Sequence, residues 1–167
     1  MRVINQGWNS DFLNSIFWFF TCFGLGWVQV LLILPLLLKP VLRITAWGGL
    51  IGFASSGILV QIVKRIAPRL RPGNWPETIQ MPDEQLRASS FASGHTATAF
   101  GIATAITLLL PLESRLKAGL FLYSVALMVG LSRIYRGVHW PTDVLGGAML
   151  GIACGCLVAH FLNRKKL

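Results

Sequence analysis

The feature that most constrains this chain is a series of five long apolar stretches. They cover residues 12–38, 44–63, 96–112, 116–131 and 144–162 of a chain of 167 residues. A helix needs roughly 17 to 25 apolar residues to cross a bilayer, so the fourth stretch is at the short end. Hydrophobic residues make up 54% of the chain and charged residues only 13%, which is too little polar surface for a soluble globule of this size.

The sequence therefore predicts an all-α integral membrane protein, with a single domain over residues 1–167 and a bundle of about five transmembrane helices. Prolines mark several expected helix ends: Pro35, Pro40, Pro68, Pro111 and Pro141. Pro35 is expected to bend or finish the first helix. That first stretch is too long for the apolar part of a signal peptide and no small-residue cleavage site follows it, so we expect it to be retained.

Polar residues gather in three short clusters at the expected helix ends. The clusters are Lys64 with Arg71-Pro72, Ser93-Gly94-His95, and Ser132-Arg133 with His139 and Asp143. With five spans, the loops after the second and the fourth span emerge on the same side of the membrane, so all three clusters are expected to converge there. Ionisable groups at the mouths of lipid-embedded helices are costly, which makes them a functional hypothesis by default.

The distribution of cations predicts the orientation in the membrane. Seven cations occupy the two short loops and the tail on the side opposite the clusters: Lys39, Arg43, Arg115, Lys117, Arg164, Lys165 and Lys166. The other eight lie on much longer segments, and three of them have a chemical use. The positive-inside rule then places the C-terminus in the cytoplasm and the clusters on the outer or periplasmic face of a bacterial cytoplasmic (inner) membrane.

The net charge of +9 is also typical of chains that bind nucleic acid. Here, however, the cations lie at helix ends beside the lipid headgroups and do not line one soluble face. The sequence predicts an anionic lipid partner and no nucleic acid.

Three cations of the clusters are suited to hold one anion. Lys64, Arg71 and Arg133 flank the converging helix ends, and arginine offers forked donors that match phosphate oxygens. Ser93 and Gly94 precede a helix, where free N–H groups attract anions and glycine permits close approach. The alternatives are cations that extend to the headgroups and an ordinary capped helix.

His139 and Asp143 are four residues apart around Trp140-Pro141. Proline disfavours helical geometry at the preceding residue, so we expect His139 in the loop and Asp143 in the first helical turn. A carboxylate on one imidazole nitrogen fixes the tautomer and frees the other nitrogen to attack or to move protons. The alternative is a carboxylate that favours the helix dipole, beside an interfacial histidine.

Taken together, the clusters have the order K-x6-R-P, S-G-H and S-R-x5-H-x3-D. This pattern resembles the type 2 phosphatidic acid phosphatase (PAP2) superfamily, which includes membrane lipid phosphatases, vanadium haloperoxidases and some soluble acid phosphatases. The resemblance implies that His139 attacks phosphorus to form a phosphohistidine, that Asp143 orients it, and that His95 protonates the leaving oxygen and then activates water. It also implies that the phosphate is held by Lys64, Arg71, Ser93, the Gly94 N–H and Arg133.

The chain departs from the family pattern in three places. Ala92 stands where the second motif usually begins with proline, and Arg136 adds a cation inside the third motif. Arg69 resembles an extra arginine often found before the R-P pair, and with Arg136 it is a candidate for contacts to a second phosphate or to the headgroup. Membrane members of the family often have six spans, whereas five spans would put the N-terminus outside the cytoplasm.

We therefore expect a membrane lipid phosphatase that needs no metal or other cofactor. The candidate substrates are undecaprenyl diphosphate, phosphatidylglycerophosphate, phosphatidate and the 1-phosphate of lipid A, with a preference for an isoprenyl diphosphate because of Arg69 and Arg136. The alternatives are a lipid phosphotransferase, which passes the phosphate to another lipid, and a transporter or binding protein without enzymatic activity.

Gly147, Gly151 and Gly155 form a stripe of small residues on the last apolar stretch. Such a stripe lets helices approach closely. We expect it to pack inside the bundle of a monomer; a homodimer interface is the alternative.

Overall fold

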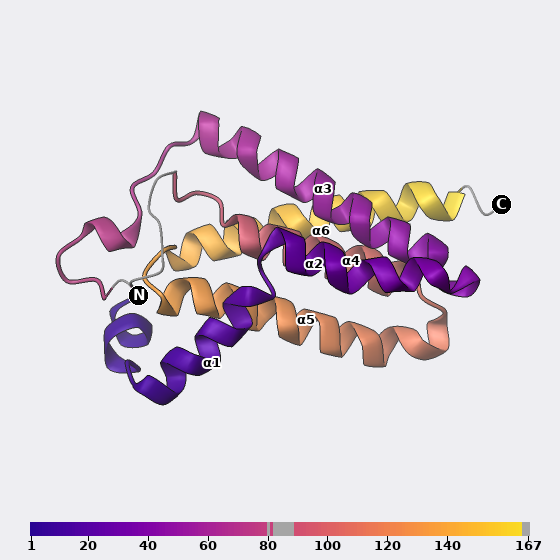
Figure 1. Cartoon of the computed structure of the whole chain (residues 1–167). Coiled ribbons are helices and arrows are strands. Elements are labelled where there is room, and N and C mark those ends of the chain that lie inside the picture. Colours follow the sequence, from indigo (N-terminus) through magenta and orange to yellow (C-terminus); the bar gives the residue numbers. More distant parts are fainter. Residues whose placement is uncertain (80, 82–88, 165–167) are drawn as a thin grey trace.

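The structure is a computed structural model that describes residues 1–79, 81 and 89–164 (Figure 1). Lys165 and Lys166, which contributed to the predicted orientation, lie outside the described residues, as does part of the connection between Lys64 and His95. The described residues form helices and no strand, which confirms the all-α fold class.

Four helices form the body of the bundle: α3 (Arg43–Ile66), α4 (Gly94–Leu109), α5 (Leu112–Tyr135) and α6 (Pro141–Arg164). The central helix is α4, which packs against each of the other three. Its residues are mostly Ala, Gly, Thr and Ile, and most of them are buried. Small and β-branched side chains let the three neighbouring helices approach it closely, so the core of the protein lies along α4.

The expected membrane spans differ in length relative to the bilayer. Helices α3, α5 and α6 are long and apolar enough to cross a membrane. Helix α4 has 16 residues, which is about 24 Å at 1.5 Å per residue and shorter than a bilayer core of about 30 Å. The fourth expected stretch, 116–131, lies within the full-length helix α5, because the helix continues for a turn beyond the apolar residues at each end.

The first apolar stretch is not one straight helix. It divides into α1 (Asp11–Cys22), α2 (Gly26–Ile33) and a 3-10 turn (Leu34–Leu38), and the two halves are bent by 62°. The break comes before Gly26. Pro35 was expected to bend or finish the helix, and α2 does end at Ile33, just before the 3-10 turn that contains Pro35. A Cβ atom at Gly24 would lie 2.4 Å from Cδ2 of His95, so the glycine lets the break pack directly against the start of α4.

The glycine stripe of α6 packs against α4. A Cβ atom at Gly147 would lie 2.6 Å from the Ser93 carbonyl oxygen, and one at Gly151 would lie 2.2 Å from the Ala97 carbonyl oxygen. At Gly155 the same atom would lie 2.6 Å from Cβ of Thr104. The prediction that the stripe serves packing within the bundle is confirmed.

The N-terminal residues close one end of the bundle. Asn5, in a short π-helix (Val3–Gly7), donates to the carbonyl oxygens of Ile79 and Tyr135, both at 2.7 Å. The Tyr135 ring stacks on Phe17 of α1 with 4.3 Å between ring centres. These contacts tie the N-terminus, α1 and the long connection to the last turn of α5.

Candidate functional site

The three polar clusters lie at the same end of the bundle. Four helix ends lie on the left side of Figure 1: the end of α3, the start of α4, the end of α5 and the start of α6. The charges of Lys64, Arg71 and Arg133 all act on His139. The predicted convergence, which followed only from the number of spans, agrees with this placement.

His139 and Asp143 are brought together as their spacing predicted. His139 lies in the loop before α6, and Asp143 lies in the first turn of that helix, which begins at Pro141. Nδ1 of His139 is 3.5 Å from Oδ2 of Asp143, and the two side chains are 3% and 0% exposed. A buried carboxylate beside Nδ1 favours the tautomer in which this nitrogen carries the proton.

Asp143 has three further hydrogen-bond donors. Oδ1 accepts a bond of 2.9 Å from the Arg69 guanidinium, and Oδ2 accepts one of 2.9 Å from the backbone N–H of Trp140. The hydroxyl of Ser90 also donates to Oδ2 and lies 3.5 Å from Nδ1 of His139. Both carboxylate oxygens are thus held in place, and an ionised, fully buried carboxylate is stabilised by several donors.

Ser90 and the contact between Arg69 and Asp143 were not predicted from the sequence. Ser90 is fully buried, yet it stands in an Ala-Ser-Ser-Phe run that has no distinctive spacing. The sequence feature that could have pointed to Ser90 is its position three residues before Ser93, close to the second cluster. Arg69 also donates to the Thr142 hydroxyl at 2.6 Å and covers the Trp140 ring at 5.5 Å, so it is bound to the start of α6.

The other ring nitrogen of His139 faces Arg71. Nη1 of Arg71 lies 3.3 Å from Nε2 of His139 and donates to the Val138 carbonyl oxygen at 3.0 Å. Arginine has no acceptor, so the contact requires a lone pair on Nε2. Burial lowers the pKa of His139 to about 4, with Arg71, Arg133 and Lys64 acting in the same direction and the hydrogen bond to Asp143 opposing them. The imidazole is therefore neutral at pH 7, with its lone pair directed at the cationic side of the site.

The cations of the first and third clusters are anchored by neutral partners. Nζ of Lys64 donates to the Ser89 carbonyl oxygen at 2.8 Å, and Arg71 reaches the same oxygen at 3.4 Å. Arg133 is 5% exposed and donates to the hydroxyl of Thr21 on α1. These contacts position three cations whose charges act on His139, and such a cluster of cations is suited to bind an anion.

The second cluster begins α4 as predicted, but the Ser93 hydroxyl has another role. Ser93 is the N-cap residue of α4, but its side chain accepts no hydrogen bond from a backbone N–H of the described residues. The Ser93 hydroxyl instead accepts a hydrogen bond of 2.8 Å from the Thr96 hydroxyl. The Ser93 N–H donates to the Asp143 carbonyl oxygen at 3.0 Å. This bond joins the start of α4 to the start of α6 and fixes the second cluster beside the third.

His95 lies partly exposed beside a cavity of about 470 Å³. The cavity is lined by Gly24 and Gly26 at the bend, by α3 residues including Phe53 and Ile58, and by Gly94 and Thr98. His95 feels the charges of Arg133, His139, Lys64 and Arg71. The cavity thus leads from the largely apolar flank of α3 to the polar cluster.

Arg136 lies beside α1. It is 2% exposed, and it lines a depression whose other residues, Asn14, Ser15, Trp18 and Phe19, all belong to α1. No three His, Cys, Asp or Glu side chains within the described ranges lie close enough to hold a metal ion. The absence of a metal from the reaction stays a prediction.

Comparison with known proteins places the chain in a family. The family model described as the PAP2 superfamily matches residues 45–167, which include all three polar clusters. The chain belongs to the PAP2 superfamily. Together with its apolar helices, this membership makes it an integral membrane protein of PAP2 type.

Two curated relatives and one solved structure describe the similarity. The chain is 33% identical to phosphatidylglycerophosphatase B of Bacillus subtilis (strain 168) over 72% of its length and 61% of the relative. It is 31% identical to the undecaprenyl-diphosphatase of Sulfolobus acidocaldarius over 83% of its length, and it spans 66% of that protein. The crystal structure of Aquifex aeolicus LpxE matches with a TM-score of 0.81 and 30% identity, covering 95% of this chain and 92% of the other.

Proposed function

We propose that this protein hydrolyses the terminal phosphate of a membrane lipid through a phosphohistidine on His139. The main support for the proposal is that each ring nitrogen of His139 has its own partner. Nδ1 lies beside a fully buried Asp143, and Nε2 faces Arg71 with its lone pair. A neutral imidazole held in this tautomer among cations is suited to attack phosphorus.

In the first step Nε2 of His139 forms a bond to phosphorus, and the bond from phosphorus to the lipid oxygen breaks. His95 gives a proton to that oxygen, so the lipid leaves as an alcohol or, from a diphosphate, as a monophosphate. In the second step His95 takes a proton from water, whose oxygen bonds to phosphorus. The bond to His139 breaks and inorganic phosphate leaves.

In this proposal five groups hold the phosphoryl oxygens during both steps: Lys64, Arg71, Arg133, Ser93 and the Gly94 N–H. Phosphoryl transfer depends mainly on positioning and on electrostatic stabilisation of these oxygens. The support for their role is that the charges of all three cations act on His139.

The substrate is a lipid whose phosphate lies at the headgroup plane and whose chain lies in the bilayer. The cavity beside His95 supports this, because it connects the catalytic end to the flank of α3. Arg69 was a candidate for contacts to a second phosphate or to the headgroup, but its bonds to Asp143 and Thr142 engage it at the start of α6. The preference for a diphosphate then rests on Arg136 alone. We propose phosphatidylglycerophosphate and undecaprenyl diphosphate as the leading candidates, with phosphatidate and lipid A 1-phosphate after them.

We also propose that the catalytic end faces the outer side of a cytoplasmic membrane and that the C-terminus is cytoplasmic. Four cations support this orientation, because they lie at or beside the opposite ends of α3 and α5: Lys39, Arg43, Arg115 and Lys117. The glycine stripe is used inside the bundle, which supports a monomer. Labelling of single cysteines placed at the two ends, in intact cells, tests the orientation.

The test is release of inorganic phosphate by the purified protein in detergent, with EDTA present, across the four lipids. His139→Ala and His95→Ala are expected to abolish release, whereas His160→Ala, an exposed histidine near the far end of α6, is expected to retain it. Vanadate is expected to inhibit. Normal turnover by the His139 variant, or a strict need for magnesium, would contradict the mechanism.

The alternatives give different results in the same assay. A phosphotransferase would release little inorganic phosphate. When an acceptor lipid is added, the phosphate would be found on that lipid. A transporter or binding protein would release none, and His139→Ala would leave its activity intact.

A further inference from the structure

A second groove lies at the end of the bundle away from the catalytic site. It has a volume of about 620 Å³ and is lined by Thr107 of α4 and by residues of the first two thirds of α5. The α5 residues are Leu112, Arg115, Leu116, Gly119, Leu120, Tyr123, Ser124 and Leu127. Arg115 precedes Arg133 by 18 residues on the same helix, which places the Arg115 end of the groove about 27 Å along the axis from Arg133.

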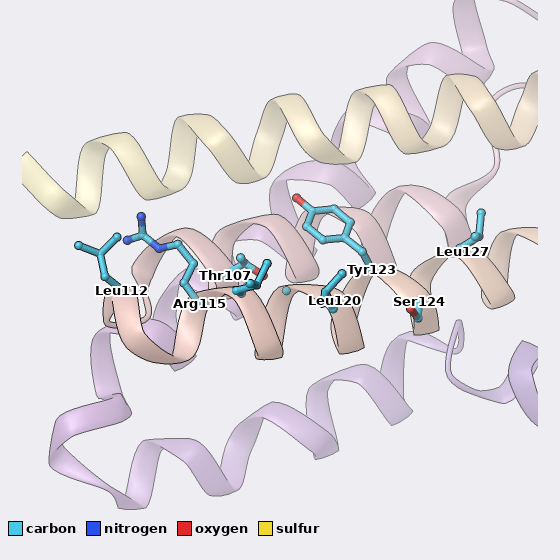
Figure 2. Close-up of a pocket in the computed structure, with 9 residues that line it drawn as sticks. Thr107, Leu112, Arg115, Leu120, Tyr123, Ser124 and Leu127 are labelled. Atoms are coloured by element: carbon cyan, nitrogen blue, oxygen red, sulfur yellow. The ribbon is translucent and has the colours of Figure 1, made fainter.

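Arg115 holds a cationic group at one end of the groove. Its Nη2 donates to the carbonyl oxygens of Leu108 and Leu110, at 2.9 and 3.2 Å, where α4 ends. Figure 2 shows Arg115 and Tyr123 rising from the same side of α5. The guanidinium is therefore fixed before any ligand binds, which lowers the entropic cost of recognition.

Two buried polar atoms at this end have no hydrogen-bond partner in the described part of the chain: Nε of Arg115 and the hydroxyl of Thr107. Thr107 is 9% exposed and lies beside Arg115 in Figure 2. An unsatisfied buried donor costs about 1 to 3 kcal/mol. If Arg115 only capped α4, both atoms would remain unsatisfied, so the groove is suited to a ligand that carries acceptor oxygens.

The rest of the groove is apolar and faces outward from a helix long enough to span the membrane. Leu112, Leu116, Leu120 and Leu127 are each more than half exposed. From Arg115 to Leu127 the helix rises about 18 Å, which is comparable with one extended fatty acyl chain. A cation at the end of an apolar groove of this length matches the phosphate and the chain of one lipid molecule.

We propose that this groove binds one phosphate-bearing glycerolipid from the leaflet opposite the catalytic site. The lipid phosphate pairs with Arg115, the Thr107 hydroxyl donates to an oxygen of the phosphate or the glycerol ester, and one acyl chain lies along Leu116, Leu120 and Leu127. The pairing of one fixed cation with an anionic headgroup selects the lipid. The site is independent of the proposed hydrolysis and needs no reaction.

The experiment is native mass spectrometry of the full chain in detergent, titrated with phosphatidylglycerol. Vanadate is present so that the catalytic site is occupied. Diacylglycerol has the same chains without phosphate, and glycerol 3-phosphate has the phosphate without chains. We expect one tightly bound phosphatidylglycerol, with at least tenfold weaker binding of the other two.

Arg115→Gln is expected to weaken the binding of this lipid about tenfold, and Thr107→Val about threefold. Leu120→Trp keeps the charge but fills the groove, and it is expected to remove the bound lipid. Lys117→Gln removes a neighbouring exposed cation outside the groove and is the matched control, with binding within twofold of wild type. Thermal unfolding in detergent verifies that each variant is folded.

Three results would overturn the proposal. The first is unchanged binding in Arg115→Gln. The second is equal binding of diacylglycerol, since this would show that no phosphate is recognised. The third is a mass of two chains that Leu120→Trp converts to one without a change in bound lipid, because the groove would then be an interface between two copies.

Discussion

Replacement of Asp143 by Asn tests whether the negative charge beside His139, and not only the shape of the site, supports the reaction. When Nε2 bonds to phosphorus, the imidazole gains positive charge. Asp143 is the anion next to this ring, at 3.5 Å from Nδ1, and the neighbouring charges of Arg71, Arg133 and Lys64 oppose the positive charge.

The expected magnitude follows from that distance. Two unit charges 3.5 Å apart interact by about 5 kcal/mol at an effective dielectric constant of about 20. Loss of this energy from the transition state lowers the rate by roughly a thousandfold or slightly more. Asn also has an NH2 group that must point at a donor, since Ser90, Trp140 and Arg69 surround both carboxylate oxygens.

The assay compares kcat of Asp143→Asn and Ser90→Ala on the best lipid substrate. Ser90→Ala removes one hydrogen bond but keeps the charge and the bonds from Arg69 and Trp140. Its main effect should be on stability, a loss of about 1.5 to 3 kcal/mol for one hydrogen bond to a charged group, with kcat lowered about tenfold or less. A rate for Asp143→Asn within tenfold of wild type, or equal losses of kcat in both variants, would refute the electrostatic reasoning.

The remaining predictions concern pH and close packing. The pKa of His139 is lowered from 6.5 to about 4, so as pH falls the unfolded chain binds a proton before the folded protein does. The free energy of unfolding should therefore fall by roughly 3 kcal/mol between pH 6.5 and 4. The imidazole NMR signal should titrate near pH 4, and His139→Asn should lose this part of the pH dependence of Tm. Gly24→Ala should lower kcat at least tenfold with a Tm within a few degrees of wild type, since the new Cβ would lie 2.4 Å from His95 and displace its ring; unchanged kcat would show that the ring has room to move. Gly151→Ala should lower stability by about 1 to 3 kcal/mol, because its Cβ would meet a backbone carbonyl oxygen of α4 at 2.2 Å, whereas Gly57→Ala makes only an ordinary contact and is the control for Tm.

Much of the architecture followed from the sequence because a bilayer limits the available structures. Backbone polar groups must be satisfied within each segment, so long apolar stretches become helices. The spacing of His139 and Asp143 around Pro141 was informative for a local reason. Proline fixed where α6 begins, and one helical turn then determined that the carboxylate could reach the imidazole.

The bend in the first apolar stretch could not be located from the sequence. Pro35 is the strongest local signal, yet the chain turns before Gly26, because Gly24 must pack against His95 across the bundle. Such a contact joins residues about 70 positions apart, and no local propensity encodes it. The use of the glycine stripe was open for the same reason, until α4 was seen to lie against it.

The sequence by itself determined the helical fold, the end of the bundle at which the polar residues gather and the pairing of His139 with Asp143, since each depends on hydrophobic length or on spacing within a few residues. Only the tertiary structure decided the partners of that pair. It placed the buried Ser90 and the partly exposed Arg69 on Asp143, and it placed Arg136 beside α1. Hydrogen bonds between distant segments depend on how whole helices pack, and this packing is set by side-chain shape along the full length of the bundle.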